Sequence, residues 1–160
     1  MRIIVAGVGR LKDGAEKILF DRYWNRLNAC GGNVGLGPIR FCEILEGKAA
    51  RSTERRKDEA ARLLKAAGDV EFSIALDEHG RAMSSKAFAA LLRDRVADGT
   101  RSAVFFLGGP DGHGAALNGS ADLSLSLGPM TLPHGLARVV LVEQLYRAAA
   151  ILAGHPYHRQ

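Results

Sequence analysis

The sequence predicts an α/β protein built on a largely parallel sheet with helices on both faces. Five short runs rich in β-branched and aromatic residues alternate along the chain with helical patterns. This alternation favours parallel pairing, because each helix carries the chain back across the sheet before the next strand begins. The chain has 160 residues, of which 47% are hydrophobic and 24% charged. This size and composition suit a single globular domain over residues 1–160.

The first half of the chain holds two strands and two helices in alternation. RIIVAGVG is apolar and rich in β-branched residues, and AEKILFDRYWNRLNAC after it places apolar side chains at intervals of three and four. After a Gly-rich stretch, IRFCEILE has the composition of a strand. The next helix begins at Ser52 or Thr53, either of which is a suitable cap, and ends at Gly68. The strands are expected over residues 2–9 and 39–46, and the helices over residues 15–30 and 52–68.

The second half continues the alternation and ends in a long helix. VEFSIALD and SAVFFLGG are apolar runs, and the helical pattern SSKAFAALLRDRVADG lies between them. DLSLSLG is a fifth, shorter strand. The last helix carries apolar residues around more than one side, so either the protein core or a second subunit has to cover it. The strands are expected over residues 70–77, 102–109 and 122–128, and the helices over residues 84–99 and 134–153.

Charge and cysteine content narrow the functional classes. The formal net charge is +5 and the pI is near 9.6, which favours a polyanionic partner such as nucleic acid. Cys30 and Cys42 lack the spacing of a metal or redox site, so we expect two buried thiols and no metal centre. The apolar run at the N-terminus is too short for a signal sequence, and no stretch reaches membrane-spanning length. We therefore expect a cytoplasmic protein without a membrane anchor.

Ligands of parallel α/β sheets bind beyond the carboxyl ends of the strands, so the loops that follow the strands are candidate sites. GVGR follows the first strand, but Lys12 stands at the third glycine position of the dinucleotide-binding motif and no suitable acidic residue follows. A tight turn is favoured there. LGGPDGHG, residues 107–114, has four glycines and is equally compatible with a structural turn and a ligand loop. SLGPMTLPH, residues 126–134, leads into the last helix, whose first amides lack helical partners.

A dense run of charges, RSTERRKDEAARLLK, covers the start of the second helix. Acidic and basic side chains are interleaved along it, which is typical of a helix face in contact with solvent. A solvated face is the favoured interpretation, and a face that contacts RNA is the alternative.

Three C-terminal segments carry a family resemblance. FFLGGPDGHG, SLGPMTLPHGLARVVLVEQLYRA and the terminal HPYHR occur in the order and spacing of the RlmH type of SPOUT-class RNA methyltransferase. The helix DEAARLLKAAG and the turn ALDEHG are similar to that family as well, so the resemblance covers most of the chain. The sequence departs from the family pattern in a Gly-rich insertion over residues 31–37 and in Gly128, Pro129 and Met130 of the loop before the last helix.

The resemblance implies an α/β fold with a deep trefoil knot at the C-terminal end, and a homodimer that packs partly through the last helix. It implies methylation of N3 of a pseudouridine in large-subunit (23S) ribosomal RNA, for which we expect the assembled ribosome to be the substrate. S-adenosylmethionine would be held bent among the knot loops. The expected cofactor-binding residues are Leu76, Gly108, Gly109, Leu127, Gly128, Pro129, Met130, Thr131 and Leu132.

The C-terminal tail HPYHR is expected to supply the groups that meet the RNA. The target nitrogen bears a proton and becomes a good nucleophile only after losing it, so a base or an electrostatic stabiliser is needed. We expect the tail to fold over the pocket, with Arg159 binding a phosphate or an oxyanion and Tyr157 stacking on or hydrogen-bonding the base. His155 and His158 are the candidate proton acceptors, and the sequence leaves open which of them acts.

The other histidines have simpler interpretations. His134 stands at the start of the last helix, where a structural hydrogen bond and a functional role are equally compatible. His113, between two glycines, is expected to be exposed, and His79, in a turn, to be solvated.

Two other functions fit parts of the sequence. A nucleotide-dependent oxidoreductase would bind a nicotinamide cofactor at the GVGR loop. A non-catalytic ribosome-binding or RNA-binding α/β protein would bind RNA without an S-adenosylmethionine pocket. The incomplete glycine motif argues against the first function. The concentration of glycine loops beside an ionisable tail argues against the second.

Overall fold

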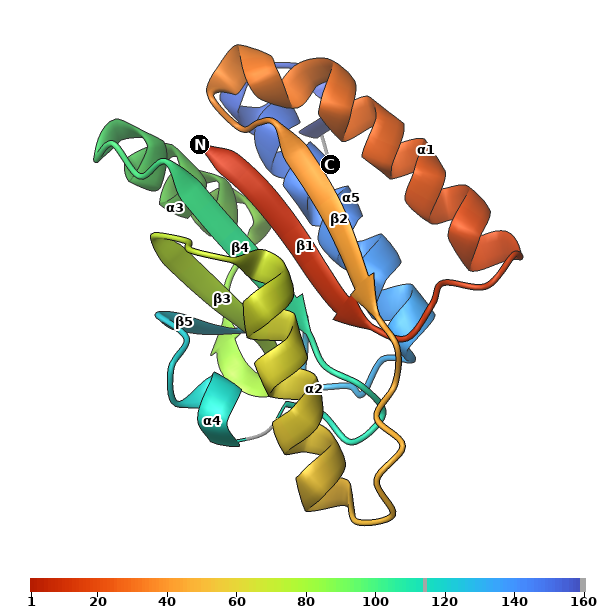
Figure 1. Ribbon diagram of the computed structural model, residues 1–160. Helices are drawn as coiled ribbons and strands as arrows, with labels where there is room; N and C mark the ends of the chain where they lie inside the picture. The colour runs from red at the N-terminus through yellow and green to blue at the C-terminus, as the bar shows by residue number, and fades with distance from the viewer. Residues whose placement is uncertain (114, 159–160) are drawn as a thin grey trace.

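The computed structural model describes residues 1–113 and 115–158, and it contains one five-stranded sheet in which every pair of neighbours is parallel (Figure 1). The strand order is β2-β1-β4-β3-β5, so consecutive strands are not always neighbours. The predicted α/β class and parallel sheet are confirmed. The strands are β1 Arg2–Val8, β2 Ile39–Ile44, β3 Phe72–Ala82, β4 Ser102–Leu107 and β5 Leu123–Ser126.

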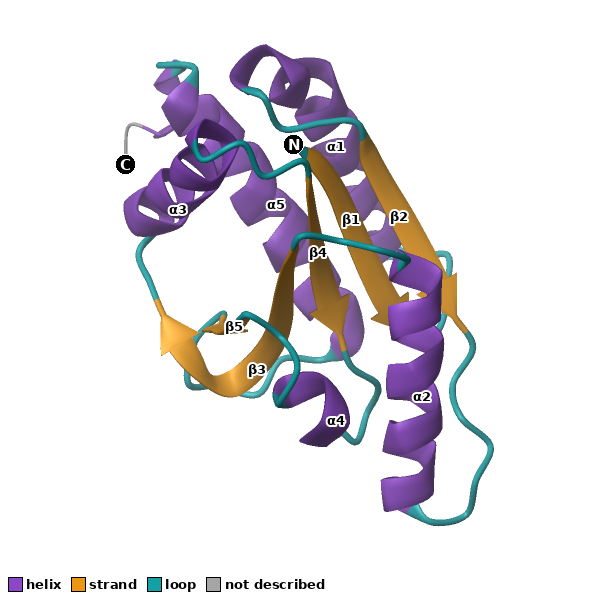
Figure 2. Cartoon of the chain, turned by 60° about the vertical axis from the view of Figure 1, so that its left-hand side comes forward, coloured by secondary structure: helices purple, strands orange, loops and turns teal. Residues whose placement is uncertain are grey.

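Helices cover both faces of the sheet, as the sequence predicts (Figures 1 and 2). On one face, α5 packs against α1 and α3, and on the other face α2 and the short α4 lie together. The helices are α1 Ala15–Cys30, α2 Ser52–Ala67, α3 Ser85–Ala97, α4 Ala115–Asn118 and α5 His134–Leu152, with 3-10 helices η1 Gly31–Val34 and η2 Pro156–His158.

The alternation of side chains along β1 explains why its sequence is apolar without interruption. Ile3 and Val5 belong to the core beneath α1, α3 and α5, whereas Ile4 and Ala6 belong to the core beneath α2. A central strand that is buried on both faces has no solvent-facing position for a polar residue. The continuous apolar pattern from which a strand was predicted thus reflects burial on both faces of the sheet.

α2 begins at Ser52 and ends before Gly68, as predicted, but the predicted N-terminal cap is wrong. The residue before the helix is Arg51, and neither Ser52 nor Thr53 caps it, because both already lie inside the first turn. Gly68 ends the helix with a positive φ of 68°, a conformation that glycine adopts without strain.

β3 extends five residues beyond its expected end. Ile74 to Leu76 pair with β5, the register then shifts, and Arg81 and Ala82 pair with β5 again. Gly80 lies so close to β5 that a Cβ atom there would be 2.8 Å from the backbone of Leu125. The chain after Leu76 therefore wraps tightly around the short fifth strand. This arrangement is compatible with the trefoil knot, which stays a prediction.

α5 runs from the carboxyl ends of the strands back toward their amino ends (Figure 1). Its 19 residues span roughly 28 Å at the ordinary helical rise. The loop before α5 and the tail after it therefore lie at opposite ends of this helix. This separation limits how one chain can assemble an active site from both.

Candidate functional site

The loops that follow β3, β4 and β5 meet at one edge of the sheet, because β3 lies between the other two strands. Contacts between the loops hold them together. The Thr131 hydroxyl donates to Glu78 Oε2 at 2.7 Å, which joins the loop after β5 to the end of β3. His134 is hydrogen-bonded to the backbone of Gly108. Its predicted structural hydrogen bond is thus present, and it links the start of α5 to the loop after β4.

The glycine-rich loop after β4 has no room for side chains at its first two residues. A Cβ on Gly108 would lie 2.8 Å from the backbone carbon of Gly112, and one on Gly109 would lie 2.8 Å from Glu59 Oε2. The Gly112 amide donates to the Gly109 carbonyl at 2.9 Å, which closes the turn. These glycines are therefore required for close approach of backbone and neighbouring side chains. Of the two interpretations of this loop, a structural turn and a ligand loop, the structural turn is present.

His113 is partly buried, so the expectation that it would be exposed is wrong. Its Nε2 lies 3.1 Å from the carbonyl oxygen of Phe106 near the end of β4, and the ring is also hydrogen-bonded to the Leu76 backbone in β3. Burial lowers the pKa of His113, against the opposing effect of the Phe106 bond. A neutral imidazole therefore joins the middle of β3 to the end of β4, from which the glycine-rich loop leaves. His79, in contrast, is exposed as expected, with 84% of its side chain accessible.

The loop after β5 is organised by one hydroxyl. Ser126 Oγ accepts the Gly128 amide at 3.1 Å and lies 3.1 Å from the carbonyl oxygen of Glu78. Gly128 has a φ of 139°, which a residue with a side chain rarely adopts. Further along, Pro129, Met130 and Thr131 are exposed, and Met130 reaches 79% accessibility. An exposed methionine beside a folded loop provides apolar surface for a ligand or partner.

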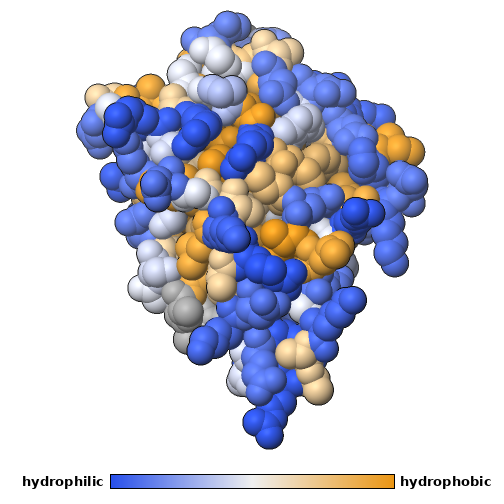
Figure 3. Space-filling model, in the orientation of Figure 1, coloured by the Kyte–Doolittle hydropathy of each residue, from blue (hydrophilic) through white to orange (hydrophobic). Residues whose placement is uncertain are grey.

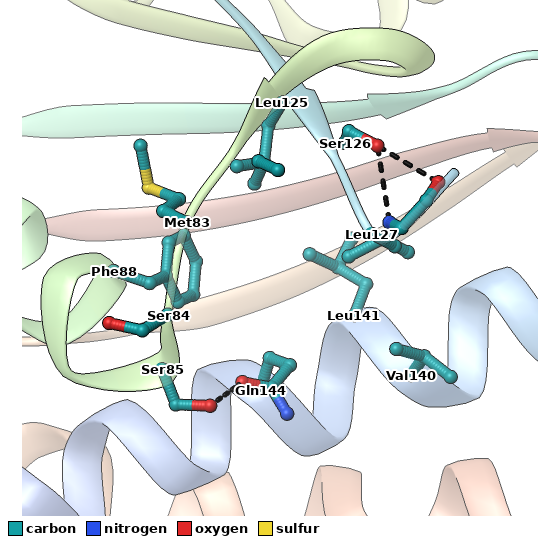
Figure 4. A pocket seen from close by; sticks show the side chains of 12 residues that line it. Met83, Ser84, Ser85, Phe88, Leu125, Ser126, Leu127, Val140, Leu141 and Gln144 are labelled. Carbon is teal, nitrogen blue, oxygen red and sulfur yellow. Dashed lines mark hydrogen bonds between the residues drawn. The ribbon is translucent and has the colours of Figure 1, made fainter. Parts of the chain in front are cut away.

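A cavity of about 300 Å³ opens beside this loop, between the end of β5, the start of α3 and the middle of α5 (Figure 4). Phe88, Leu125 and Leu141 form apolar walls, and the Ser85 hydroxyl bonds to Gln144 at the rim at 2.7 Å. Two expected cofactor residues, Leu127 and Gly128, line the cavity. The other seven do not line it: Leu76, Gly108, Gly109, Pro129, Met130, Thr131 and Leu132.

A buried arginine, which the sequence did not single out, fastens α5 to the first strand. Arg138 is 2% exposed and donates to the carbonyl of Val8, to the carbonyl of Gly9 at 2.8 Å and to Glu43 Oε1 at 3.0 Å. Burial lowers its pKa, but a guanidinium starts so high that it stays protonated. The single charged residue inside the otherwise apolar run LARVV is the feature of the sequence that could have indicated a buried arginine. The guanidinium fills the GVGR turn, which leaves no open dinucleotide loop there.

The tail packs on its own helix instead of on the strand-end loops. Tyr157 donates to Glu143 Oε1 at 3.1 Å and its ring lies 4.7 Å from that of Tyr146. Burial and hydrogen bonds with Tyr23 and Glu143 raise the pKa of Tyr157. The described part of the tail therefore lies at the far end of α5 from the loops of its own chain, and the fold of a tail over the pocket stays a prediction.

The other candidate residues of the tail are His155, His158 and Arg159. His155 is exposed, and its Nδ1 accepts the Tyr157 amide at 3.2 Å. His158 ends η2, and Arg159 lies outside the described residues. Cys30 and Cys42 are free thiols that are partly rather than fully buried.

Comparison with known proteins identifies the family. The model of a family described as "Predicted SPOUT methyltransferase" matches residues 1–158. The chain belongs to the SPOUT methyltransferase family. Proteins called "Ribosomal RNA large subunit methyltransferase H" are similar over 159 residues, 99% of each chain. The one from Rhizobium leguminosarum bv. trifolii (strain WSM2304) is 47% identical and the one from Brucella anthropi is 45% identical.

A solved structure supports the SPOUT fold. A probable methylase family protein from Haemophilus influenzae Rd KW20 has a TM-score of 0.51 at 13% identity, covering 97% of this chain and 69% of that chain. None of the helices over the described residues is long and apolar enough to cross a membrane. The same part of the chain contains no group of three or more His, Cys, Asp or Glu placed to hold a metal ion.

Proposed function

We propose that this protein methylates N3 of a pseudouridine in large-subunit ribosomal RNA, with S-adenosylmethionine as methyl donor. It acts in the cytoplasm on the assembled ribosome, and residues 1–160 form one methyltransferase domain. The observation that carries the proposal is full-length similarity, at 45% to 47% identity, to proteins named for methylation of this RNA. The strand-end loops described above are where we propose that the cofactor binds.

The residues at the strand ends fit the cofactor. Cavities that bind small molecules are mostly apolar with a few polar groups at fixed positions, and the cavity beside β5 has this character. Leu127 and the Gly128 backbone would hold the adenosine part, with Leu76 and Gly108 along the neighbouring loops. The closed glycine turn, in which a Cβ on Gly108 has no room, brings backbone amides rather than side chains to the ligand. When bound, the cofactor supplies an activated methyl group on a sulfonium.

A second subunit would complete the site, because the tail and the loops of one chain lie at opposite ends of α5. One stripe of α5, comprising Leu136, Val140, Glu143, Arg147 and Ile151, remains partly or fully exposed between α1 and α3. A homodimer that packs these stripes in opposite directions would bring the tail of one subunit to the loops of the other. Self-complementary twofold contacts of this kind are the commonest in soluble oligomers.

The tail residues then have separable tasks. Tyr157 keeps its proton, since its pKa is raised, and serves as a hydrogen-bond donor or stacking surface rather than as a base. His155 Nδ1 accepts the Tyr157 amide, which orients the imidazole ring within the tail. His155 and His158 are the candidate acceptors of the N3 proton, and Arg159 would stabilise the developing oxyanion. Holding the target nitrogen in line is itself worth several kcal/mol.

Calorimetric titration with S-adenosylmethionine tests the cofactor site, and Leu127→Trp is the matched variant. The larger ring would enter the cavity, so saturable binding by the wild type should be lost in the variant while its circular dichroism is unchanged. Transfer of a labelled methyl group to undermodified ribosomes tests the substrate. No transfer by a wild-type protein that binds the cofactor would overturn the ribosomal assignment, and RNA binding without cofactor binding would favour the non-catalytic alternative.

A further inference from the structure

The positive charge of this protein is concentrated in one short segment. Residues 47–57, GKAARSTERRK, carry five basic side chains and one acidic side chain, a net charge of +4. The whole chain has a net charge of +5, so the other residues together are almost neutral. We call residues 47–57 the basic segment. It comprises the end of the loop after β2 and the first turns of α2.

The basic segment projects beyond the carboxyl ends of the strands. Figure 1 shows the start of α2 and the loop before it at the lower end of the molecule, past the strand tips, and Figure 3 shows that hydrophilic residues cover most of this end. Lys48, Arg51 and Lys57 are exposed, and the side chain of Arg51 is 82% accessible. Solvated cations at a protruding end create a positive potential that reaches incoming ligands.

These cations are not neutralised by the protein itself. Among the described residues, Lys48, Arg56 and Lys57 have no carboxylate within 4.0 Å, and Arg51 has only a 3.8 Å contact with Glu54, a pair exposed on both sides. Exposed pairs of this kind contribute little and are screened by salt. The interleaved charges of the sequence therefore do not pair into a neutral face at this end of α2.

The basic segment is attached to the candidate active site. Arg55, the fifth cation, donates to Asp111 in the glycine-rich loop at 2.9 Å and to the carbonyls of Ala49 and Ala50 at 2.8 Å and 3.0 Å. Buried Glu59 accepts the Gly47 amide at 2.7 Å and abuts Gly109 from below. Arg55 and Glu59 each contact both the basic segment and the loop after β4. These two residues therefore fix the basic segment beside that loop.

We propose that the basic segment binds the phosphodiester backbone of the RNA next to the target nucleotide. This proposal rests on the proposed function. A nucleotide that enters the strand-end site has flanking phosphates on both sides, and Lys48, Arg51 and Lys57 stand where one flank passes. The uncapped first turn of α2 adds unpaired amides of the same electrostatic sign. RNA is favoured over an anionic membrane surface because the segment lacks apolar side chains that would enter a bilayer.

The test is a triple variant, Lys48→Ala, Arg51→Ala and Lys57→Ala, which leaves the anchoring Arg55 intact. A matched triple, Lys65→Ala, Arg93→Ala and Arg101→Ala, removes the same charge from exposed positions near the amino ends of the strands. Binding to purified ribosomes is measured as a function of salt. The first triple should weaken binding roughly tenfold or more and reduce the log–log salt slope by about two, since each phosphate contact contributes about 0.7 to 0.9.

Each outcome has one meaning. S-adenosylmethionine binding should be unchanged in both triples, and the matched triple should keep the wild-type affinity for ribosomes. Equal weakening by both triples would show a general charge effect and overturn the proposal, as would unchanged ribosome binding by the first triple. Loss of binding to phosphatidylserine vesicles alone would assign the segment to membranes instead. A wild type that binds ribosomes through the segment but transfers no methyl group would refute the proposed function and leave the RNA-binding role standing.

Discussion

The separation of loops and tail along α5 makes a quantitative prediction for mixed dimers. The 19-residue helix places the two regions roughly 28 Å apart in one chain. The described part of the tail turns into η2, and Tyr157 holds it on Glu143, so it stays at the end of α5 that is far from the loops. In the homodimer proposed above, each active site combines the loops of one subunit with the tail of its partner.

Two inactive variants provide the perturbation. Leu127→Trp fills the cofactor cavity, and a double variant, Tyr157→Phe with Arg159→Ala, removes two tail groups. Each homodimer has two damaged sites and should be inactive. In a mixed dimer, the intact loops of the tail variant meet the intact tail of the Leu127 variant, so one of the two sites is complete.

The expected recovery follows from reassortment of subunits in a twofold dimer. Mixing equal amounts with subunit exchange gives about one half mixed dimers, each with one working site, or about a quarter of wild-type activity. The assay is methyl transfer to ribosomes after co-expression or mild denaturation and refolding of the mixture. Absence of any recovery, with mixed dimers demonstrated by differential tagging, would refute the shared site and place the tail over the loops of its own chain.

Three further predictions concern the residues that shape the site. Arg138→Ala removes a buried cation and leaves backbone carbonyls unpaired, so the free energy of unfolding in urea should fall by about 3–5 kcal/mol. The control Arg93→Ala, at an exposed position, should lower it by less than about 0.5 kcal/mol. A loss below about 1 kcal/mol for Arg138→Ala would contradict the anchoring role of this residue. Gly80→Ala forces the backbones of β3 and β5 apart and should lower the free energy of unfolding by about 1–3 kcal/mol. Gly32→Ala, with open space around its Cβ position, should leave it unchanged or raise it slightly. Equal changes of the melting temperature in the two variants would refute the close approach at Gly80. His113 has a lowered pKa when folded, so its share of stability is present above the ordinary histidine pKa and is lost as pH falls below it. In His113→Gln, the free energy of unfolding should therefore decline less between about pH 7 and pH 5 than in the wild type. An unchanged slope would show that burial of His113 does not cause this pH dependence.

Much of the fold was available from local patterns. The run Ile3 to Val8, apolar without a break, predicted a strand, and Gly68 marked the end of α2 because a residue there needs a positive φ. The strand-end loops were predicted as candidate sites from glycine content and strand order alone. Two of the expected cofactor residues, Leu127 and Gly128, line the cavity beside the loop after β5.

Other features depended on contacts between distant parts of the chain. β3 extends past its expected end because Arg81 and Ala82 pair again with β5, which lies more than forty positions away in the sequence. His113 is buried because the glycine turn folds its ring onto carbonyls of two strands, although its neighbours in sequence suggested exposure. Ser52 and Thr53 resembled caps, yet both lie inside the first turn and Arg51 precedes the helix.

The sequence by itself determined the order of strands and helices, the parallel sheet and the chemistry present in the glycine loops and the tail. Only the tertiary structure decided that Arg138 anchors the first strand and that the basic segment stands beside the glycine loop. It also separated the tail from the loops by the length of α5. The reason is physical: periodicity and turn propensity act between near neighbours, whereas burial, ion pairing and the shape of a site arise when distant segments pack together.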